Sequence, residues 1–584
     1  MNRHSFLQGL LCLLSGVGMA VAAAPLNWWG LAWVGMIPLW WLARGDTEAA
    51  DPVLSWSPLS SQKTLVRQKT RHPMASVAAP QCSKVKHSPP TTHDSTAPSI
   101  SRGLSPLSSP SLGTALFLAL LWGLGFYGYT LVWITDLHPL TWLGVPWLAS
   151  VAIALFCWLF ITLWGAALPV LWLGLMRQGR QRFHLSPGKW VFLGAALWAG
   201  LEWVWSQGPL AWTNLAFTQS PGNRVILHLG QLGGPFLVSA AIAAVNGYFA
   251  EAGICQLASK NGRNQAPGLT AIALTICFTG HLLGYGLMRQ PLQDAPNRAI
   301  KIGIIQGNVP TRTKLTTAGI RQAEIGYTQG YRQLAQAGAE LVLTPEGALP
   351  LIWKASRFAQ TDLYQAIQQE AVPILVGAFF QESDGLARSL LTLDATAQLV
   401  SRYDKIKLVP LGEYTPFAGV LGNLINQLSP VQENGKPGGF DQRLDTPLGR
   451  AIAAICYDST FPQVLQRQAQ AGGEFILTAA NLDPYREMLM QQYEAQEVMR
   501  AIETDRWLVR ATNTGYSGVI DPRGRVIWRS RPYTYQISIH RIYRRNDKTL
   551  YVALGNRMLP LCLGSVATFG IFLATVTKRV VRSP

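Results

Sequence analysis

The chain has 584 residues, of which 49% are hydrophobic and only 14% are charged. Soluble domains carry about 25% charged residues, so this composition excludes an ordinary soluble protein, and the length indicates more than one domain. The formal net charge is +18, but the cations mostly flank apolar stretches. We therefore expect a membrane protein and no nucleic-acid partner.

Apolar stretches of bilayer-spanning length recur along the chain. Residues 6–24 and 26–43 come first, separated by almost no gap. The A-V-A-A-A run before Pro25 is also typical of a cleaved signal peptide, but an uncleaved transmembrane hairpin over residues 1–44 explains both stretches. Each later stretch approaches the roughly 20 residues that cross a bilayer. These stretches are 113–134, 145–176, 190–206, 234–252, 269–288 and 554–576. The sequence thus predicts about eight spans.

Residues 45–112 differ from their surroundings because they are rich in Ser, Pro and Thr, with scattered Lys and Arg. They contain too few large apolar side chains to offset the entropy of ordering, so we predict a disordered loop with no catalytic role. Basic residues also gather at 177–189, at 260–263 and at 578–582. With the N-terminus inside, the positive-inside rule places the loop and these three groups in the cytoplasm.

This topology divides the chain into successive parts. They are a transmembrane hairpin (1–44), a basic cytoplasmic loop (45–112), a transmembrane bundle (113–289), an extracytoplasmic domain (290–551) and a final transmembrane helix with a basic tail (552–584). The extracytoplasmic domain alternates two kinds of pattern. Stretches typical of strands lie at 299–309, 341–344 and 372–379, and stretches typical of helices lie at 316–338 and 359–370. Such alternation indicates an α/β domain.

Three strand-end segments carry residues suited to chemistry. Residues 341–343 lead to Glu346, the segment R-Y-D-K-I-K-L-V-P-L-G-E-Y holds Lys405, and the apolar run A-I-A-A-I ends at Cys456. Strand ends are where α/β folds usually display catalytic side chains. Taken singly, each residue has a structural explanation, because a free cysteine is usually a buried apolar residue and an isolated Glu or Lys is usually solvated.

Taken together, these segments resemble the nitrilase (carbon–nitrogen hydrolase) superfamily over about residues 300–547. T-P-E-G-A-L-P, Y-D-K-I-K-L-V-P-L-G-E-Y and I-C-Y-D match its three motifs in order, and V-R-A-T-N-T-G-Y-S-G-V-I-D-P-R-G-R-V matches its closing strands. The L-V-P-L-G-E-Y-T-P version, preceded by several spans, is similar to the membrane branch, the apolipoprotein N-acyltransferases. The resemblance implies a polytopic α-helical membrane domain plus an α/β nitrilase-like αββα sandwich.

By this resemblance the catalytic triad is Glu346, Lys405 and Cys456. The nucleophile is a thiolate, so Cys456 needs a base, and Glu346 can take its proton. A lysine ammonium can hold the carboxylate and stabilise the oxyanion of a tetrahedral intermediate. Lys405 and Lys407 both qualify on chemistry, and the family motif selects Lys405.

The resemblance also implies supporting or substrate-positioning roles for Glu413, Tyr457 and Asp458. The family more usually has Glu in place of Asp458. The chain departs from the family pattern at two further places. After F-I-L-T it reads A-A-N-L-D-P-Y where relatives have N-D-x-W-F. Trp205 stands where an arginine is usual. The A-A-N-L-D-P-Y departure bears on the substrate contacts that relatives make from that loop, and it leaves the triad intact.

Two features of the sequence stay open. Glu202, in a predicted span, is either a functional residue or a buried structural partner, and we leave it outside the catalytic set. Residues 420–439 are either a lid or membrane-dipping arm beside the site or a surface insertion packed on the domain. The histidines are scattered and no C-x-x-C pair exists, so we expect no metal, no cofactor and no disulfide framework.

The resemblance implies phospholipid-dependent N-acylation of the N-terminal diacylglyceryl-cysteine of bacterial lipoproteins, the last step of lipoprotein maturation. Cys456 would carry the acyl group from a membrane phospholipid as a thioester before the apolipoprotein amine accepts it, which gives ping-pong kinetics. We expect a monomeric multi-pass enzyme of the bacterial cytoplasmic (inner) membrane, with its catalytic domain on the periplasmic side.

Two other functions use parts of the same pattern. A membrane-tethered amidase or nitrilase would use the same triad with water as the acceptor, but it would not need the spans. A transporter with an inactive nitrilase-like domain would need ionisable residues along its path, and the predicted spans hold few of them. The complete triad and the spans together favour the acyltransferase.

Overall fold

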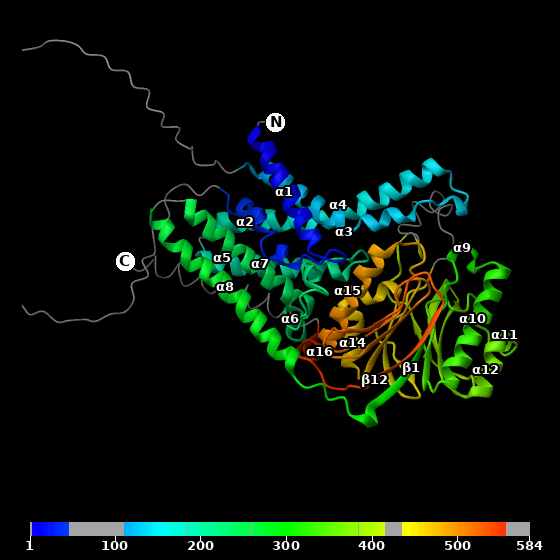
Figure 1. Cartoon of the computed structure of the whole chain (residues 1–584). Coiled ribbons are helices and arrows are strands. Elements are labelled where there is room, and N and C mark those ends of the chain that lie inside the picture. Colours follow the sequence, from blue (N-terminus) through cyan, green and yellow to red (C-terminus); the bar gives the residue numbers. More distant parts are fainter. Residues whose placement is uncertain are drawn as a thin grey trace, which may run out of the picture. The chain divides into compact units, whose positions relative to one another are not determined.

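The computed structural model describes residues 3–45, 110–183, 185–257, 260–383, 385–410, 412–414 and 435–555 (Figure 1). The predictions for the basic loop, for the 420–439 insertion and for the last span concern residues almost wholly outside these ranges. In chain order the described residues form a set of helices and then an α/β sandwich.

The N-terminal part is helical. Its helices are α1 (Arg3–Val21), α2 (Ile37–Arg44), α3 (Leu112–Thr130), α4 (Trp147–Arg182), α5 (Pro187–Gln207), α6 (Arg224–Leu227), α7 (Gly230–Leu257) and α8 (Lys260–Arg289). Segments of α3, α4, α7 and α8 are long and apolar enough to cross a membrane, and the apolar stretch of α1 is shorter. The predicted polytopic helical domain is therefore confirmed, but the count of about eight spans is not confirmed by the described residues.

The predicted second span, residues 26–43, is not one continuous helix. It folds as a 3₁₀ turn, η1 (Trp29–Trp33), followed by α2, which has 8 residues and rises only about 12 Å. The Asn246 amide of α7 donates to the main-chain oxygen of Ala32 at 2.9 Å and accepts the N–H of Met36 at 2.8 Å. One side chain of a neighbouring helix, Asn246, thus satisfies two main-chain groups at the break. Backbone buried in a membrane requires such partners.

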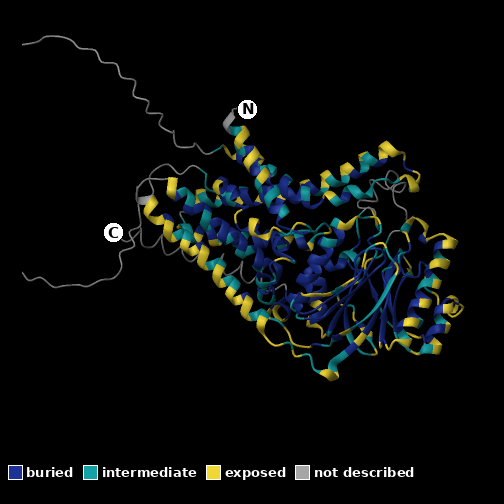
Figure 2. Cartoon of the chain, in the orientation of Figure 1, coloured by how far each residue is buried: buried dark blue, intermediate teal, exposed yellow. Residues whose placement is uncertain are grey.

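The helices present apolar side chains to the exterior, and Figure 2 shows a row of exposed residues along α8. Large exposed apolar residues on α4 and α8 include Leu148, Phe156, Phe160, Phe278 and Leu282. In water this surface would form an unusually large apolar patch, whereas lipid tails can cover it. The exposed surface therefore suits a bilayer.

The C-terminal part contains two six-stranded sheets, with the orders β12-β1-β2-β3-β4-β5 and β11-β10-β9-β8-β7-β6. Strands β1 to β3 are parallel in the first sheet and β7 to β9 in the second, and the outer strands run antiparallel. The strands are β1 (Ala299–Gln306), β2 (Leu341–Leu343), β3 (Ile374–Glu382), β4 (Gly385–Leu393), β5 (Leu399–Asp404), β6 (Leu444–Thr446), β7 (Gly449–Ile455), β8 (Phe475–Ala480), β9 (Leu508–Thr512), β10 (Gly518–Ile520), β11 (Val526–Arg529) and β12 (Gln536–Tyr543).

Helices cover the outer faces of the two sheets (Figure 1). On the first sheet, α10 (Thr317–Gln336) and α12 (Asp362–Glu370) pack their apolar faces against strand residues in one buried cluster. On the second lie α14 (Pro462–Gln470) and α15 (Glu487–Thr504). The sheets face each other, since the Thr512 hydroxyl of β9 donates to the Gln306 side-chain oxygen of β1 at 3.4 Å. The αββα sandwich is therefore confirmed.

Candidate active site

The three predicted triad residues all follow the ends of strands. Glu346 lies shortly after β2, Lys405 directly follows β5, and Cys456 directly follows β7. Cys456 begins the 3₁₀ turn η6 (Cys456–Thr460) and has a φ of 48°. This left-handed conformation is uncommon for a side chain other than glycine or asparagine, and strained backbone of this kind often marks functional sites. The turn reverses the chain at the thiol.

Lys405 is the centre of a buried cluster of charges. Its Nζ lies 3.0 Å from Oε1 of Glu346 and 2.7 Å from Oε1 of Glu413, and its side chain is 0% exposed. Burial works against the charged form of Lys405, but the two carboxylates outweigh burial and raise its pKa. Lys405 is therefore held as an ammonium between two carboxylates.

Glu413 extends the cluster to a second cation. Its Oε1 lies 3.1 Å from Nε of Arg388, and its Oε2 accepts the main-chain N–H of Val409 at 2.8 Å. Burial opposes ionisation of Glu413, but Lys405 and then Arg388 lower its pKa. Arg388 was missed by the sequence prediction, although a lone arginine within the apolar strand G-L-A-R-S-L-L-T-L is a signal that could have marked it.

Glu346 is fixed by donors on both carboxylate oxygens. Oε1 binds Lys405, and Oε2 accepts the main-chain N–H of Asn481 at 3.1 Å. Asn481 belongs to the A-A-N-L-D-P-Y segment that departs from the family pattern, so this segment contributes a main-chain donor to the site. A side chain is not needed for that contact, which explains how the sequence can differ there.

The thiol of Cys456 needs help to ionise. Burial raises its pKa, and the Lys405 ammonium opposes that effect. The main-chain oxygen of Cys456 accepts a short hydrogen bond from the Tyr493 hydroxyl of α15, and the Ser459 hydroxyl donates to the same oxygen at 3.3 Å. The half-buried Cys456 thiol near an ammonium and a carboxylate can react once a base removes its proton. Tyr493 carried no recognisable signal in the sequence.

Asp458 joins the turn Cys456–Thr460, which we call the nucleophile turn, to the end of β5 next to Lys405, which we call the lysine strand end. Its carboxylate, fully buried, accepts main-chain N–H groups from Ile455 at 3.1 Å, Ile406 at 3.1 Å and Lys407 at 2.6 Å. The Tyr403 hydroxyl also donates to it at 3.0 Å. Burial raises the pKa of Asp458 to about 6. The contacts are those of a positioning residue between two sheets.

Lys407 lies away from the charge cluster. Its Nζ donates to the main-chain oxygens of Gln207 at 3.3 Å and Gly208 at 3.4 Å, at the end of α5. The same Nζ lies 4.5 Å from the ring centroid of Phe461. Of the two candidate lysines, only Lys405 meets both carboxylates, and Lys407 instead bridges the sandwich and the helical part.

Residues 206–212, which we call the docking segment, run from the end of α5 across the nucleophile turn. The Tyr457 hydroxyl lies 3.1 Å from the oxygen of Pro209 and 3.1 Å from both the N–H and the oxygen of Ala211. Its ring stacks on Trp212 with centroids 6.4 Å apart. Gln463 of α14 donates to the oxygen of Ser206 at 2.7 Å. The neighbour of the nucleophile is thus anchored to the helical part of the chain.

Glu202, which lies outside the catalytic set, and Trp205, which departs from the family pattern, both make structural contacts. Glu202 is buried and accepts the Trp198 indole N–H at 2.9 Å and the Leu215 main-chain N–H at 2.8 Å. The Trp205 indole donates to the main-chain oxygen of Trp164 at 3.2 Å. These contacts favour the structural reading of Glu202 over a functional one.

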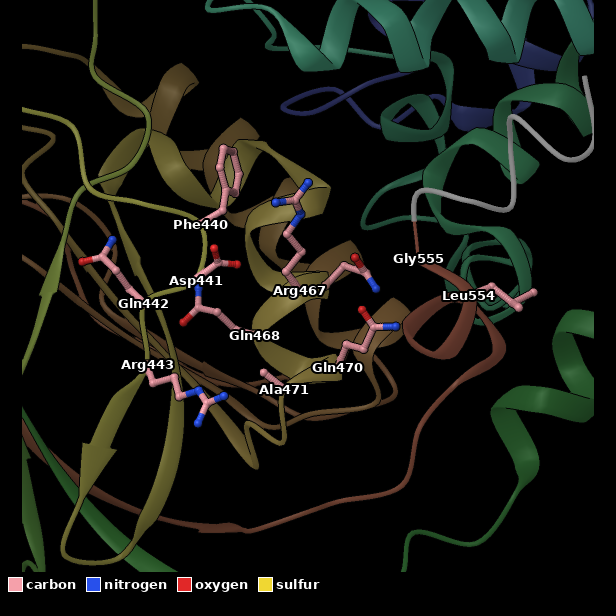
Figure 3. Close-up of a pocket in the computed structure, with 11 residues that line it drawn as sticks. Phe440, Asp441, Gln442, Arg443, Arg467, Gln468, Gln470, Ala471, Leu554 and Gly555 are labelled. Carbon is pink, nitrogen blue, oxygen red and sulfur yellow. The ribbon is translucent and has the colours of Figure 1, made fainter.

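A separate cavity of about 520 Å³ lies between residues 440–443, α14 and the end of α16 (Leu550–Leu554), as Figure 3 shows. Its walls carry Asp441, Arg443 and Arg467 beside several glutamines. None of the predicted site residues lines it. The triad therefore occupies a different place in the sandwich.

The fold and this cluster define the carbon–nitrogen hydrolase class, and comparison with known proteins agrees. Residues 301–546 match the family model described as carbon-nitrogen hydrolase, and residues 103–248 match the apolipoprotein N-acyltransferase N-terminal domain. A protein named apolipoprotein N-acyltransferase from Nostoc sp. is 46% identical, over 77% of this chain and 88% of its own.

Relatives with the same name extend the match over almost the whole chain. The one from Synechocystis sp. is 43% identical over 93% of this chain and 96% of its own. The one from Thermosynechococcus vestitus is 36% identical over 95% of this chain and 93% of its own. The chain therefore belongs to the apolipoprotein N-acyltransferase family, and its apolar helices make it a membrane protein.

Proposed function

We propose that this protein transfers an acyl group from a membrane phospholipid to the N-terminal amine of diacylglyceryl-cysteine lipoproteins, with Glu346, Lys405 and Cys456 as its triad. The names of its relatives support the lipoprotein acceptor. One observation carries the mechanism: Lys405 contacts Glu346 at 3.0 Å and Glu413 at 2.7 Å near the half-buried thiol of Cys456.

In the first half-reaction Glu346 takes the proton of the Cys456 thiol, and the thiolate attacks the carbonyl carbon of a phospholipid ester. The Lys405 ammonium stabilises the oxyanion that forms. The C–O bond then breaks, and the lysophospholipid alkoxide leaves with the proton from Glu346. Cys456 is left as an acyl thioester, and Glu346 is again a carboxylate.

In the second half-reaction the neutral α-amine of the lipoprotein attacks the thioester carbonyl. Glu346 takes a proton from the attacking nitrogen, and Lys405 again stabilises the oxyanion. The C–S bond breaks, and Cys456 regains its proton from Glu346. The product is an amide, and the covalent intermediate gives ping-pong kinetics.

Glu413, Tyr457 and Asp458 act as positioning residues in this proposal. Glu413 neutralises and orients Lys405 through its own contact to Nζ at 2.7 Å. Asp458 and Tyr457 hold the nucleophile turn against the lysine strand end and the docking segment. Each acts through another residue, because no described contact takes any of them to the sulfur.

We place the catalytic domain, residues 290–551, on the periplasmic side of the bacterial inner membrane, and we expect a monomer. Loop charges at 177–189 and 260–263 support this orientation, because basic loops remain in the cytoplasm. The docking segment supports a site held close to the helical part, where two lipid-anchored substrates can meet. An amidase acting on soluble substrates would have no use for this anchoring.

Incubation of the protein with phospholipid alone tests the proposal. The wild type should accumulate an acyl group on Cys456 that hydroxylamine removes, as read by mass spectrometry of the peptide. Adding a diacylglyceryl-cysteine peptide should discharge it as an N-acyl peptide. Cys456→Ser is the control and should form no hydroxylamine-sensitive adduct, because a hydroxyl is much harder to ionise than a thiol.

Two results would contradict the proposal. A thioester that decays to free fatty acid at the same rate with or without the peptide would indicate a hydrolase. Full acyl transfer by Cys456→Ser would exclude the thioester mechanism.

A further inference from the structure

Lys314 is a buried lysine beside the catalytic cluster, and no motif in the sequence marks it. It ends the short helix α9 (Thr311–Lys314) and is 6% exposed. Its Nζ donates to the main-chain oxygen of Glu346 at 3.2 Å. Among the described residues this is the only hydrogen bond of the Lys314 side chain, which forms no ion pair there.

The loop that carries Lys314 is tied to the catalytic centre at its other end. The Asn513 side chain accepts the N–H of Val309 at 2.9 Å and donates to the oxygen of the same residue at 2.6 Å. Asp483 accepts the N–H of Thr311 at 2.7 Å. Asp483 follows Asn481 in one loop, and the Asn481 N–H donates to Glu346. The loop that carries Lys314 and the loop that carries Asn481 are thus hydrogen-bonded to each other, and both contact Glu346.

The turn at Glu346 continues through Gly347, which lies next to the Lys314 side chain. Gly347 has a φ of 56°, in the left-handed region, and an added Cβ there would lie 3.5 Å from Nζ of Lys314. Lys314 therefore lies directly against the turn. Glu346 is then held at three points: by Lys314 on its main chain, by Lys405 on Oε1 and by Asn481 on Oε2.

We propose that Lys314 is a positioning residue for the catalytic base, whose ammonium holds the Glu346 main chain so that the carboxylate meets Lys405 and the Asn481 amide. This inference rests on the proposed function, in which Glu346 is the base. A buried ammonium without a carboxylate partner is unfavourable by itself. A role in placing the base gives this lysine a function, since a misplacement of the base by about 1 Å can lower a rate about 10²-fold.

The hydrogen bond from Lys314 to the Glu346 main-chain oxygen depends on pH. Burial lowers the pKa of Lys314 to about 8, although Glu346 and Asp483, the charged groups that act on it, oppose the shift. The ammonium is therefore present below this pH and is lost as the pH rises through it. A neutral amine is a weaker donor than an ammonium, so the contact to the Glu346 oxygen weakens on the alkaline side.

Two substitutions and a matched control test this role. Lys314→Met keeps the length of the side chain and removes its donors, whereas Lys314→Arg keeps a cation that does not titrate below about pH 12. Lys548→Met is the control, because Lys548 is exposed and donates to another main-chain oxygen, that of Gln470, at 2.8 Å. The readout is the rate of thioester formation on Cys456 from phospholipid, measured across a pH series.

We expect wild type to exceed Lys314→Met by about 10²-fold near pH 7, with the ratio falling above about pH 8. Lys314→Arg should retain its advantage over Lys314→Met throughout the series, and Lys548→Met should match wild type. Equal rates and parallel pH profiles for wild type and Lys314→Met would overturn the proposal.

A folding defect in Lys314→Met would move the decision to wild type against Lys314→Arg. A wild-type rate that falls relative to Lys314→Arg above about pH 8 supports the proposal, and parallel profiles overturn it. A wild type that forms no thioester at any pH would instead refute the proposed function, so the two failures are distinct.

Discussion

The carboxylate of Asp458 accepts the main-chain N–H of Lys407 at 2.6 Å, and this bond joins the turn that begins at Cys456 to the strand end that carries Lys405. The two elements belong to different sheets, since Lys405 follows β5 and Cys456 follows β7. A single buried side chain therefore contacts both the turn that carries Cys456 and the strand end that carries Lys405.

Asp458→Asn should loosen this joint. An amide places an NH₂ group where the carboxylate has its second acceptor, and each buried N–H left without a partner costs about 1–3 kcal/mol. We expect a lower unfolding temperature in detergent and thioester formation reduced about 10-fold or more. Asp394→Asn is the control, because Asp394 also accepts two main-chain N–H groups, of Thr396 and Gln398, in an exposed turn. Equal stability and rate in both variants would exclude this role.

Lys405→Ala and Lys407→Ala should separate the two lysines. Lys405→Ala removes the cation that contacts both carboxylates, and loss of one oxyanion donor should lower the rate of acyl transfer about 10²–10³-fold. Lys407→Ala removes contacts to the oxygens of Gln207 and Gly208 and to the Phe461 ring, none of them to Glu346 or Glu413, so its effect should be much milder. A comparison of transfer rates in membranes at equal protein level is sufficient. The reverse order would make Lys407 the catalytic lysine.

Tyr457→Phe should report on the docking segment. The substitution removes the hydroxyl contacts to Pro209 and Ala211 but keeps the ring that stacks on Trp212. We expect thioester formation to fall about 10-fold because the nucleophile turn loses its anchor. Tyr535→Phe is the matched control, since its hydroxyl donates to the Gly326 oxygen at 2.7 Å on α10. A wild-type rate for Tyr457→Phe would show that ring stacking alone holds the turn.

Deletion of residues 46–109, the part of the predicted 45–112 loop that lies outside the described residues, should leave acyl transfer unchanged. These residues lie outside the described structure, so their lack of a catalytic role stays a prediction from composition, which is too poor in large apolar side chains to form a core. Transfer activity of the shortened protein in membranes is the measurement, with membrane insertion checked separately. Loss of activity in a normally inserted variant would contradict the prediction.

Local features of the sequence were enough to predict the α/β domain and the strand ends that carry Glu346, Lys405 and Cys456. Each lies after a short apolar run, and a buried strand followed by a polar residue is a pattern read within a few positions. The choice of Lys405 over Lys407 needed more than this pattern, since both lysines follow the same strand. The family motif supplied the choice, and the contacts to the two carboxylates agree with it.

Other parts depended on partners far away in the chain, which no local pattern records. Residues 26–43 are apolar enough for a span, yet their backbone breaks where Asn246 supplies a donor and an acceptor 214 and 210 positions away. Likewise the Tyr457 hydroxyl meets Ala211 across 246 positions. Composition and periodicity describe which residues will be buried, whereas hydrogen-bond partners are assigned only when packing brings the elements together. The break in residues 26–43, the Tyr457 anchor and the role of Lys314 were therefore decided by the tertiary structure alone.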